Sequence, residues 1–151
     1  MPGNHLLLPF MLISVLALLE GLWAGLVRIG WAVPVFPALL PVDHGPLMVS
    51  GFLGSLIALE RVAALRREWM YISPLLTGAG WVLSLAVPAS TLGPVLITLG
   101  SEAAVLILVV IIQREPALHT SAIGLGAACW LVGNFLWLGG LSIYRVVLWW
   151  A

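Results

Sequence analysis

Five apolar runs, each about twenty residues long and almost free of charge, constrain what this chain can fold into. They extend over residues 6–27, 44–65, 70–87, 92–113 and 120–141. A helix of about 20 apolar residues crosses the hydrocarbon core of a bilayer. Because lipid offers the backbone no hydrogen-bond partners, an open chain can cross it only as helices. The pattern therefore predicts an all-α, polytopic transmembrane helix bundle of about five complete helices, in one domain over residues 1–151.

The composition supports lipid as the solvent and excludes several partners. Hydrophobic residues make up 62% of the chain and charged residues 8%, whereas about a quarter of a soluble domain is charged. The formal net charge is zero and there is no lysine, so no basic surface for nucleic acid is expected. The lone cysteine, Cys129, lies in an apolar run and is interpreted as a small hydrophobic residue.

The last residues resemble the entry to a sixth helix. After Tyr144 and Arg145 the sequence continues Val146-Val147-Leu148-Trp149-Trp150 before Ala151. A helix interrupted there would leave carbonyl groups unpaired in lipid. We therefore expect the chain to be the N-terminal part of a longer membrane protein.

Arginine placement predicts the orientation. With alternating helices, Arg66, Arg67 and Arg114 share one side of the membrane with the N-terminus, and Arg28 and Arg145 lie on the other. The positive-inside rule makes the first side cytoplasmic. We expect a multi-pass protein of the bacterial inner (plasma) membrane with a cytoplasmic N-terminus.

Ionisable residues inside predicted spans are the first candidates for function, because their burial in lipid is costly unless they are paired or face a cavity. Glu20, Glu60 and Glu102 qualify, with Arg61 beside the second of them. Arg61 can extend to the interface while Glu60 turns inward. Small residues around Glu102 predict close approach of another helix that brings it a polar partner. The three carboxylates fit either hydrogen bonding between helices or a proton relay.

The second run has the most organised face. His44, Met48, Gly51 and Ser55 follow one another at steps of four, three and four residues, which places them on one helical stripe. A histidine with a thioether one turn away suits an axial ligand of haem or a copper site. The alternative is that His44 donates a hydrogen bond at the start of the helix and Met48 packs.

The string from Asp43 to Arg61, DHGPLMVSGFLGSLIALER, resembles a motif of the NnrS family of polytopic bacterial membrane proteins, which contain haem and copper and are linked to nitric oxide stress. That family's helix opens with His-x-His-Glu-Met, followed by an aromatic residue and glycine. His44 matches the first histidine and Met48 the methionine. The resemblance implies haem or metal binding through His44 and a role in nitrosative stress or respiration. Pro46 and Leu47 stand where the second histidine and the glutamate would be, so copper held by two histidines is not expected.

Two other functions remain open from the sequence. The chain could be a small-molecule or proton-coupled transporter that uses Glu20, Glu60 and Glu102. It could also be a structural subunit whose small-residue faces bind membrane partner subunits or a second copy of itself.

Overall fold

The computed structural model describes residues 7–36, 41–65 and 67–150, and it contains helices and connecting turns. Five helical segments are long and apolar enough to span a membrane. The all-α bundle predicted from the sequence is confirmed. In chain order the elements are α1 (Leu7–Arg28), η1 (Pro41–Asp43), α2 (His44–Pro46), η2 (Leu47–Gly54), α3 (Ser55–Leu65), η3 (Glu68–Tyr71), α4 (Ile72–Ala86), α5 (Leu92–Arg114), α6 (Leu118–Leu138) and α7 (Ile143–Trp150).

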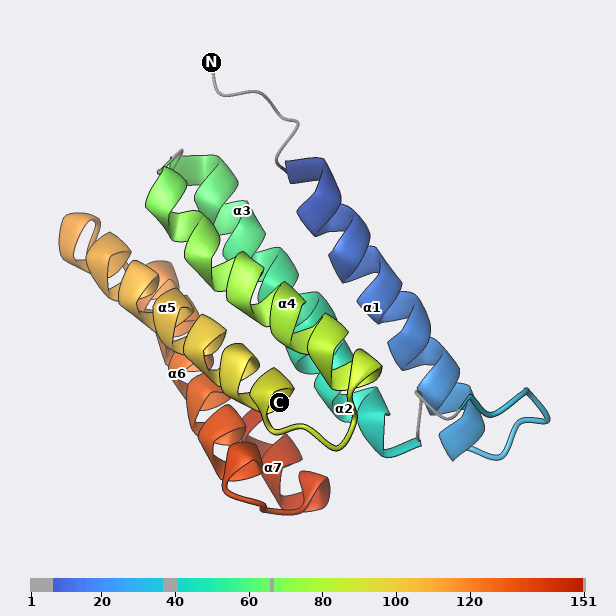
Figure 1. The fold of residues 1–151 in the computed structure, drawn as a ribbon. Helices are drawn as coiled ribbons and strands as arrows, with labels where there is room; N and C mark the ends of the chain where they lie inside the picture. Colours follow the sequence, from blue (N-terminus) through green and yellow to red (C-terminus); the bar gives the residue numbers. More distant parts are fainter. Residues whose placement is uncertain (1–6, 37–40, 66, 151) are drawn as a thin grey trace.

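The helices are arranged as a layered bundle (Figure 1). α1 lies on one side and packs mainly on η2, while α3 and α4 occupy the middle. α4 packs along α5, and α5 packs along α6. The short helix α7 folds back against α6. The second span, built from α2, η2 and α3, and the helix α4 thus occupy the middle of the bundle.

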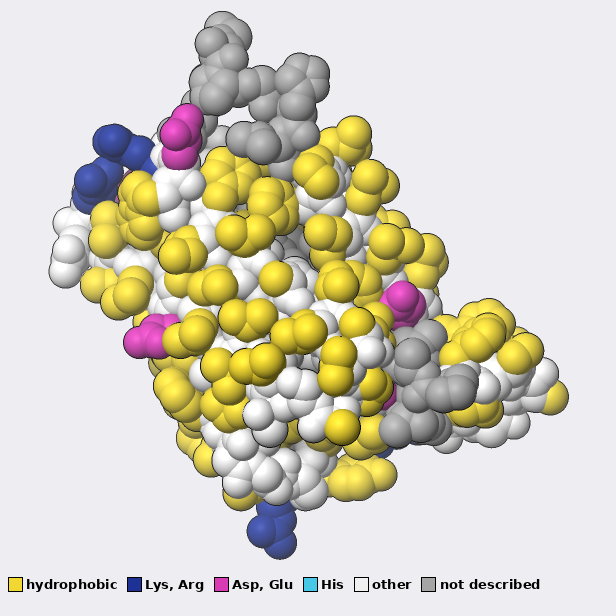
Figure 2. Space-filling model, viewed as in Figure 1, with side chains coloured by type: hydrophobic (Ala, Val, Ile, Leu, Met, Phe, Trp, Pro, Cys, Tyr) yellow, Lys and Arg dark blue, Asp and Glu magenta, His cyan; other side chains and the backbone are white. Residues whose placement is uncertain are grey.

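The outer surface is apolar, as lipid requires. Figure 2 shows hydrophobic side chains over most of one face, with basic side chains at the two ends of the bundle. Large side chains such as Leu12, Leu19 and Leu106 are about half exposed along the helices. Few of the described residues in α1 and α6 are buried, since these helices lie at the edges. This apolar surface, together with the five long apolar helices, identifies the chain as a membrane protein.

The predicted spans match the helices closely, with small shifts at the ends. The second span, His44–Leu65, has the predicted limits. The fifth was predicted over 120–141 but runs Leu118–Leu138, because Gly140, with a φ of 85°, turns the chain soon after Leu138. The predicted first residue of the first span, Leu6, and Arg66 of the polar turn lie outside the described residues.

Glycines allow α4 and α5 to approach closely. A Cβ atom at Gly80 would lie 2.7 Å from the carbonyl oxygen of Gly93, and one at Gly100 would lie 2.8 Å from the backbone nitrogen of Thr77. Backbone atoms cannot move aside as a flexible side chain can. Contacts of this kind, with Ser73 donating to the Gly100 carbonyl at 2.8 Å, are how small residues hold membrane helices together.

The second span has a feature that the sequence did not predict. Leu47–Gly54 forms a π-helix of eight residues between the two α-helical parts. π-Helical turns take more residues than α-helical turns and are often found at functional sites. The side-chain hydroxyl of Ser55 donates to the carbonyl of Ser50, five residues back, at 3.2 Å. The side chains of η2 consequently point in directions that differ from those predicted by α-helical spacing.

Candidate functional site

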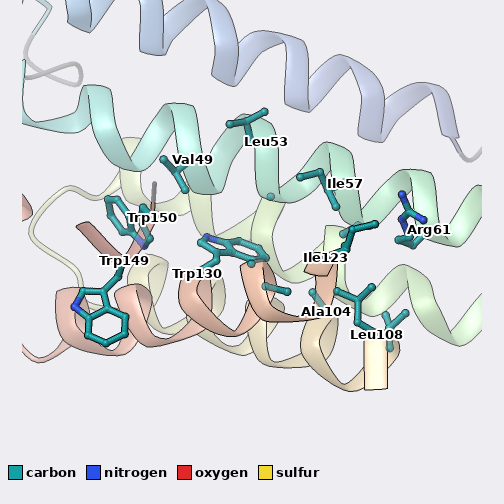
Figure 3. Close-up of a pocket in the computed structure, with 15 residues that line it drawn as sticks. Val49, Leu53, Ile57, Arg61, Ala104, Leu108, Ile123, Trp130, Trp149 and Trp150 are labelled. Carbon is teal, nitrogen blue, oxygen red and sulfur yellow. The ribbon is translucent and has the colours of Figure 1, made fainter. Parts of the chain in front are cut away.

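A partly open cavity of about 350 Å³ lies between the second span and helices α5, α6 and α7 (Figure 3). Its size is at the lower end of the range for small-molecule sites. The wall is almost entirely apolar and aromatic, with one charged side chain. It is lined by Val49, Leu53, Gly54, Ile57, Ala58, Arg61, Ala104, Ile107, Leu108, Ile123, Gly126, Ala127, Trp130, Trp149 and Trp150.

One side of the cavity is a stripe on the second span. Val49, Leu53, Ile57 and Arg61 follow at steps of four residues and all line the cavity. In Figure 3 they run in this order along the helix, so that Arg61 lies at one end and Val49 near the other. The stripe gives the cavity a polar end and a long apolar wall.

Trp130 of α6 forms the middle of the opposite wall (Figure 3). Its six-membered ring lies directly on Gly54, where a Cβ atom would overlap it. Its indole N–H donates to the hydroxyl of Ser50 at 3.0 Å, and that hydroxyl donates to the side-chain oxygen of Asn134 at 3.2 Å. Both serine and asparagine are fully buried. The indole is therefore held by packing on one side and by a hydrogen bond at its edge.

Two glycines of α6 shape the rest of this wall in opposite ways. Gly126, one turn before Trp130, lines the cavity, and an added Cβ atom there would meet nothing within 4 Å. At Gly133 an added Cβ atom would overlap the indole of Trp150. Trp150 also packs edge-on against Trp137 with ring centroids 5.9 Å apart. α7 thus closes the apolar end of the cavity with tryptophan rings.

Arg61 is the single charged residue of the cavity wall. Its side chain is half-buried, and its Nε atom is buried with no hydrogen-bond partner in the part of the chain that the structure describes. A guanidinium is always charged and has five N–H donors but no acceptor. A buried donor without a partner is costly. The arrangement can bind an anion or a carbonyl oxygen at this end.

His44 and Met48 lie elsewhere, against α1. The Nδ1 atom of His44 donates to the carbonyl of Gly21 at 2.7 Å, because a carbonyl can only accept. A Cβ atom at Gly25 would lie 2.9 Å from that nitrogen, and one at Gly21 would lie 2.9 Å from the sulfur of Met48. Both side chains fill the space that the absent side chains of Gly21 and Gly25 leave on α1.

The predicted stripe from His44 to Ser55 does not face a single neighbouring helix over its whole length. His44 and Met48 face α1, but Gly51 lies between Ala17 of α1 and Trp81 of α4. One step further, the hydroxyl of Ser55 donates to that of Thr77 in α4 at 3.1 Å. His44, Met48 and Gly51 thus all lie against α1, whereas Ser55 hydrogen-bonds to α4.

The haem expectation can be tested against these contacts. The Nδ1 bond leaves Nε2 of His44 with its lone pair, which is the arrangement of a metal-ligating histidine. Met48 does not fit as a second ligand, because its sulfur is packed into the space at Gly21. No group of three or more possible metal-ligating residues occurs among the described residues. Of these two residues, only His44 has an atom, Nε2, that its contacts leave as a candidate metal ligand.

The three carboxylates do not form one site. Glu20 is half-buried on α1 and has one buried carboxylate oxygen without a hydrogen-bond partner among the described residues. Glu60 and Glu102 are exposed, and none of the three lines the cavity. The expectation that Glu60 turns inward is wrong, since Leu59 and Val62 occupy the inner face of α3 instead. The close contact predicted beside Glu102 exists, but Gly100 makes it with α4.

Two four-residue spacings in the sequence, neither of which involves the predicted metal ligand or the three carboxylates, belong to the cavity wall. The four-residue steps from Val49 to Arg61 placed a cation and three aliphatic residues on one face. Gly126 and Trp130, also four residues apart, supplied the facing wall. Nothing in the sequence showed that α6 places its tryptophan opposite Gly54, because this pairing depends on the tertiary packing.

Fold and cavity define the class: a polytopic α-helical membrane protein with a tryptophan-lined cavity that has one cationic end. The chain belongs to the family described as "Domain of unknown function (DUF8744)", whose profile matches residues 7–151. No curated protein sequence and no solved structure matches the chain.

Proposed function

We propose that this protein binds an amphiphilic anion in the tryptophan-lined cavity, with the anionic head group at Arg61 and the apolar body along Trp130. The observation that carries the proposal is that Arg61 is the one charged side chain in the wall of an otherwise apolar cavity. A carboxylate or a phosphate in the cavity supplies an acceptor for the guanidinium, whose Nε atom is buried without a partner among the described residues. Hydrogen bonds to such a charged partner are among the stronger ones in proteins.

The form of the cavity supports an elongated ligand. Its polar and apolar ends are separated along the second span, from Arg61 to Val49 (Figure 3). The flat ring of Trp130 and the open space at Gly126 face this length. Fatty acids and phospholipids share the required chemistry. Arg61 lies near the end of α3 that leads to Arg67, so the arginine distribution favours the cytoplasmic leaflet of an inner membrane as the source of the ligand. Labelling of an Arg114→Cys variant with a membrane-impermeant thiol reagent, added to one side of the membrane at a time, tests that orientation.

Binding of radiolabelled palmitate to the full chain in detergent tests the proposal. We expect saturable binding that Arg61→Gln weakens about 10- to 100-fold, the equivalent of a lost charge-assisted hydrogen bond. Gly126→Leu should abolish binding, because its side chain fills the cavity without meeting another residue at Cβ. Gly126→Ala is the matched control and should retain most of the binding.

Competition experiments with labelled palmitate distinguish a fatty-acid ligand from a phospholipid ligand. Competition by excess lysophosphatidic acid, but not by its uncharged monoacylglycerol counterpart, shows that a phosphate head group also binds at Arg61. If neither compound competes with palmitate, the head group that binds at Arg61 is a carboxylate. Equal palmitate binding by the wild type, Arg61→Gln and Gly126→Leu would contradict the proposal, because the label would then be dissolved in the micelle.

Haem binding is the second candidate function, favoured by the Nδ1 bond of His44 to Gly21. In this proposal, which also follows the resemblance to the NnrS family, Nε2 of His44 binds the iron and the protein acts in nitrosative stress or respiration. Protein purified after expression with added haem should show a Soret band that His44→Ala shifts or removes. The control is Met48→Leu, which should leave the band in place because the sulfur packs against α1. A protein without the band, or with a band unaffected by His44→Ala, excludes this function.

A further inference from the structure

A smaller pocket, separate from the tryptophan-lined cavity, lies at the end of the bundle where the second span and α5 both end. Its walls come from the last residue of α3, from Arg67 and Met70 around the start of η3, and from the last turn of α5. Its volume is about 170 Å³, which is below the range of sites that enclose a whole small molecule. This pocket, hereafter the Arg67 pocket, can therefore take one end of a larger molecule.

The Arg67 pocket carries charges of both signs. The guanidinium groups of Arg67 and Arg114 and the carboxylate of Glu115 all line it. The three side chains are exposed, and within residues 7–36, 41–65 and 67–150 none of them makes an ion pair or a hydrogen bond to another side chain. α5 also ends here, and the last carbonyl groups of a helix are the negative end of its dipole. The pocket thus offers two cations to an anion, and a carboxylate with helix carbonyl groups to a cation.

The position of the pocket along the spans decides which molecules it meets. The spans His44–Leu65 and Leu92–Arg114 both end at it, and helices that cross the hydrocarbon core end at the level of the lipid head groups. Trp69, two residues after Arg67, is exposed, as is typical of tryptophan at the membrane–water interface. Figure 2 shows basic and acidic side chains at the end of the bundle where α4 begins. Lipid head groups therefore surround the pocket in any bilayer.

We propose that the Arg67 pocket binds a phospholipid head group that carries both a phosphate and a primary ammonium group, as phosphoethanolamine does. The phosphate accepts hydrogen bonds from Arg67 and Arg114, whose planar guanidinium groups suit phosphate oxygens. The ammonium group donates to the carboxylate of Glu115 and to the carbonyl groups at the end of α5. A head group without a cation would place its phosphate near Glu115 with nothing to balance that carboxylate. This site is independent of what the cavity at Arg61 binds.

The apolar part of the Arg67 pocket suits the rest of such a lipid. Leu65, Val110 and Ile111 complete its wall. Val110 and Ile111 precede Arg114 by about one turn of α5, so they lie on the side of the charges that leads into the bilayer. Leu65 is exposed on the surface of α3. The glycerol and the first acyl carbons can thus lie along these residues while the head group binds at the arginines.

Native mass spectrometry of the full chain in detergent tests the proposal. The probe is an equimolar mixture of phosphatidylethanolamine, phosphatidylcholine and phosphatidylglycerol with the same acyl chains. We expect the ethanolamine lipid to bind about tenfold more tightly than the choline lipid, whose quaternary ammonium has no N–H to donate. Arg114→Gln should weaken its binding about tenfold, the effect of one lost charge-assisted hydrogen bond. Glu115→Gln should remove the preference for the ethanolamine lipid over the glycerol lipid.

Two variants are matched controls. Glu68→Gln removes a neighbouring exposed carboxylate that does not line the Arg67 pocket, so the lipid preference should be that of the wild type. Arg61→Gln removes the cation of the other cavity and should also leave the lipid preference unchanged. Thermal unfolding followed by circular dichroism verifies that every variant is folded.

Preferred binding of the ethanolamine lipid that falls in Arg114→Gln, and loses its selectivity in Glu115→Gln but not in Glu68→Gln, supports the proposal. Equal binding of the three lipids by the wild type overturns it. Binding that Arg114→Gln leaves unchanged also overturns it. A preference of the wild type for the glycerol lipid overturns it as well and makes a purely anionic head group the occupant.

Discussion

Replacing Gly80 by valine is expected to push α4 away from α5 and to lower the stability of the protein substantially. A Cβ atom at this position would lie 2.7 Å from the carbonyl oxygen of Gly93 and 2.8 Å from the backbone nitrogen of Ile97. Both are backbone atoms of a facing helix, so the helices themselves must move apart. Overpacking of a well-packed contact costs about 3 kcal/mol, a large part of the roughly 5–15 kcal/mol that stabilises a typical protein. Thermal unfolding in detergent, followed by near-ultraviolet circular dichroism, measures the loss.

Ala79→Val is the matched control for this substitution. Ala79 is the preceding residue of the same helix but is exposed, so the same β-branched side chain enters lipid or detergent instead of α5. Its unfolding temperature should stay close to that of the wild type. Equal unfolding temperatures for Gly80→Val and Ala79→Val would show that α4 and α5 do not pack through Gly80.

The second large effect is expected at Ser50, whose hydroxyl joins α6 to the second span. Ser50→Ala removes both the acceptor for the indole N–H of Trp130 and the donor to Asn134. All three side chains are buried, so the indole is left with an unpaired donor. We expect a loss of about 1–3 kcal/mol in the free energy of unfolding. The same thermal unfolding measurement applies.

Ser14→Ala provides the comparison for Ser50. Ser14 is just as buried, but its hydroxyl donates only to the carbonyl of Phe10 in its own helix, at 3.0 Å. Its removal leaves no other side chain unpaired and should change stability little. Combining Ser50→Ala with Trp130→Phe should cost less than the sum of the two single substitutions, since they break the same bond. Full additivity would show that the bond does not contribute.

The limits of the spans could be predicted from the sequence because hydrophobic length and polar breaks are local properties. The second span was predicted at His44–Leu65 and occupies those residues. Its π-helical turns were not predicted, and within them Gly51 and Gly54 pack on tryptophans that α4 and α6 supply from far along the chain. The stripe through His44 consequently changes neighbours along its length.

The candidate site was harder to predict because residue type does not show which way a side chain faces. Glu102 has small neighbours, and the sequence suggested that they bring it a partner. In the structure Gly100 packs on α4, and the carboxyl group of Glu102 is exposed. The sequence did not predict that Arg61 lines a cavity, because the other walls come from helices more than forty residues further along the chain.

Crystals grown with a fatty acid that carries bromine at its methyl end test the central claim, that the cavity holds an anionic amphiphile, most directly. The anomalous difference map identifies the bromine by its anomalous scattering, which the light atoms of protein and lipid do not share. We expect a peak between Trp130 and Trp150, with the carboxylate density at the guanidinium of Arg61, and the loss of both in Gly126→Leu. Bromine peaks confined to the outer, lipid-facing surface of the helices would contradict it.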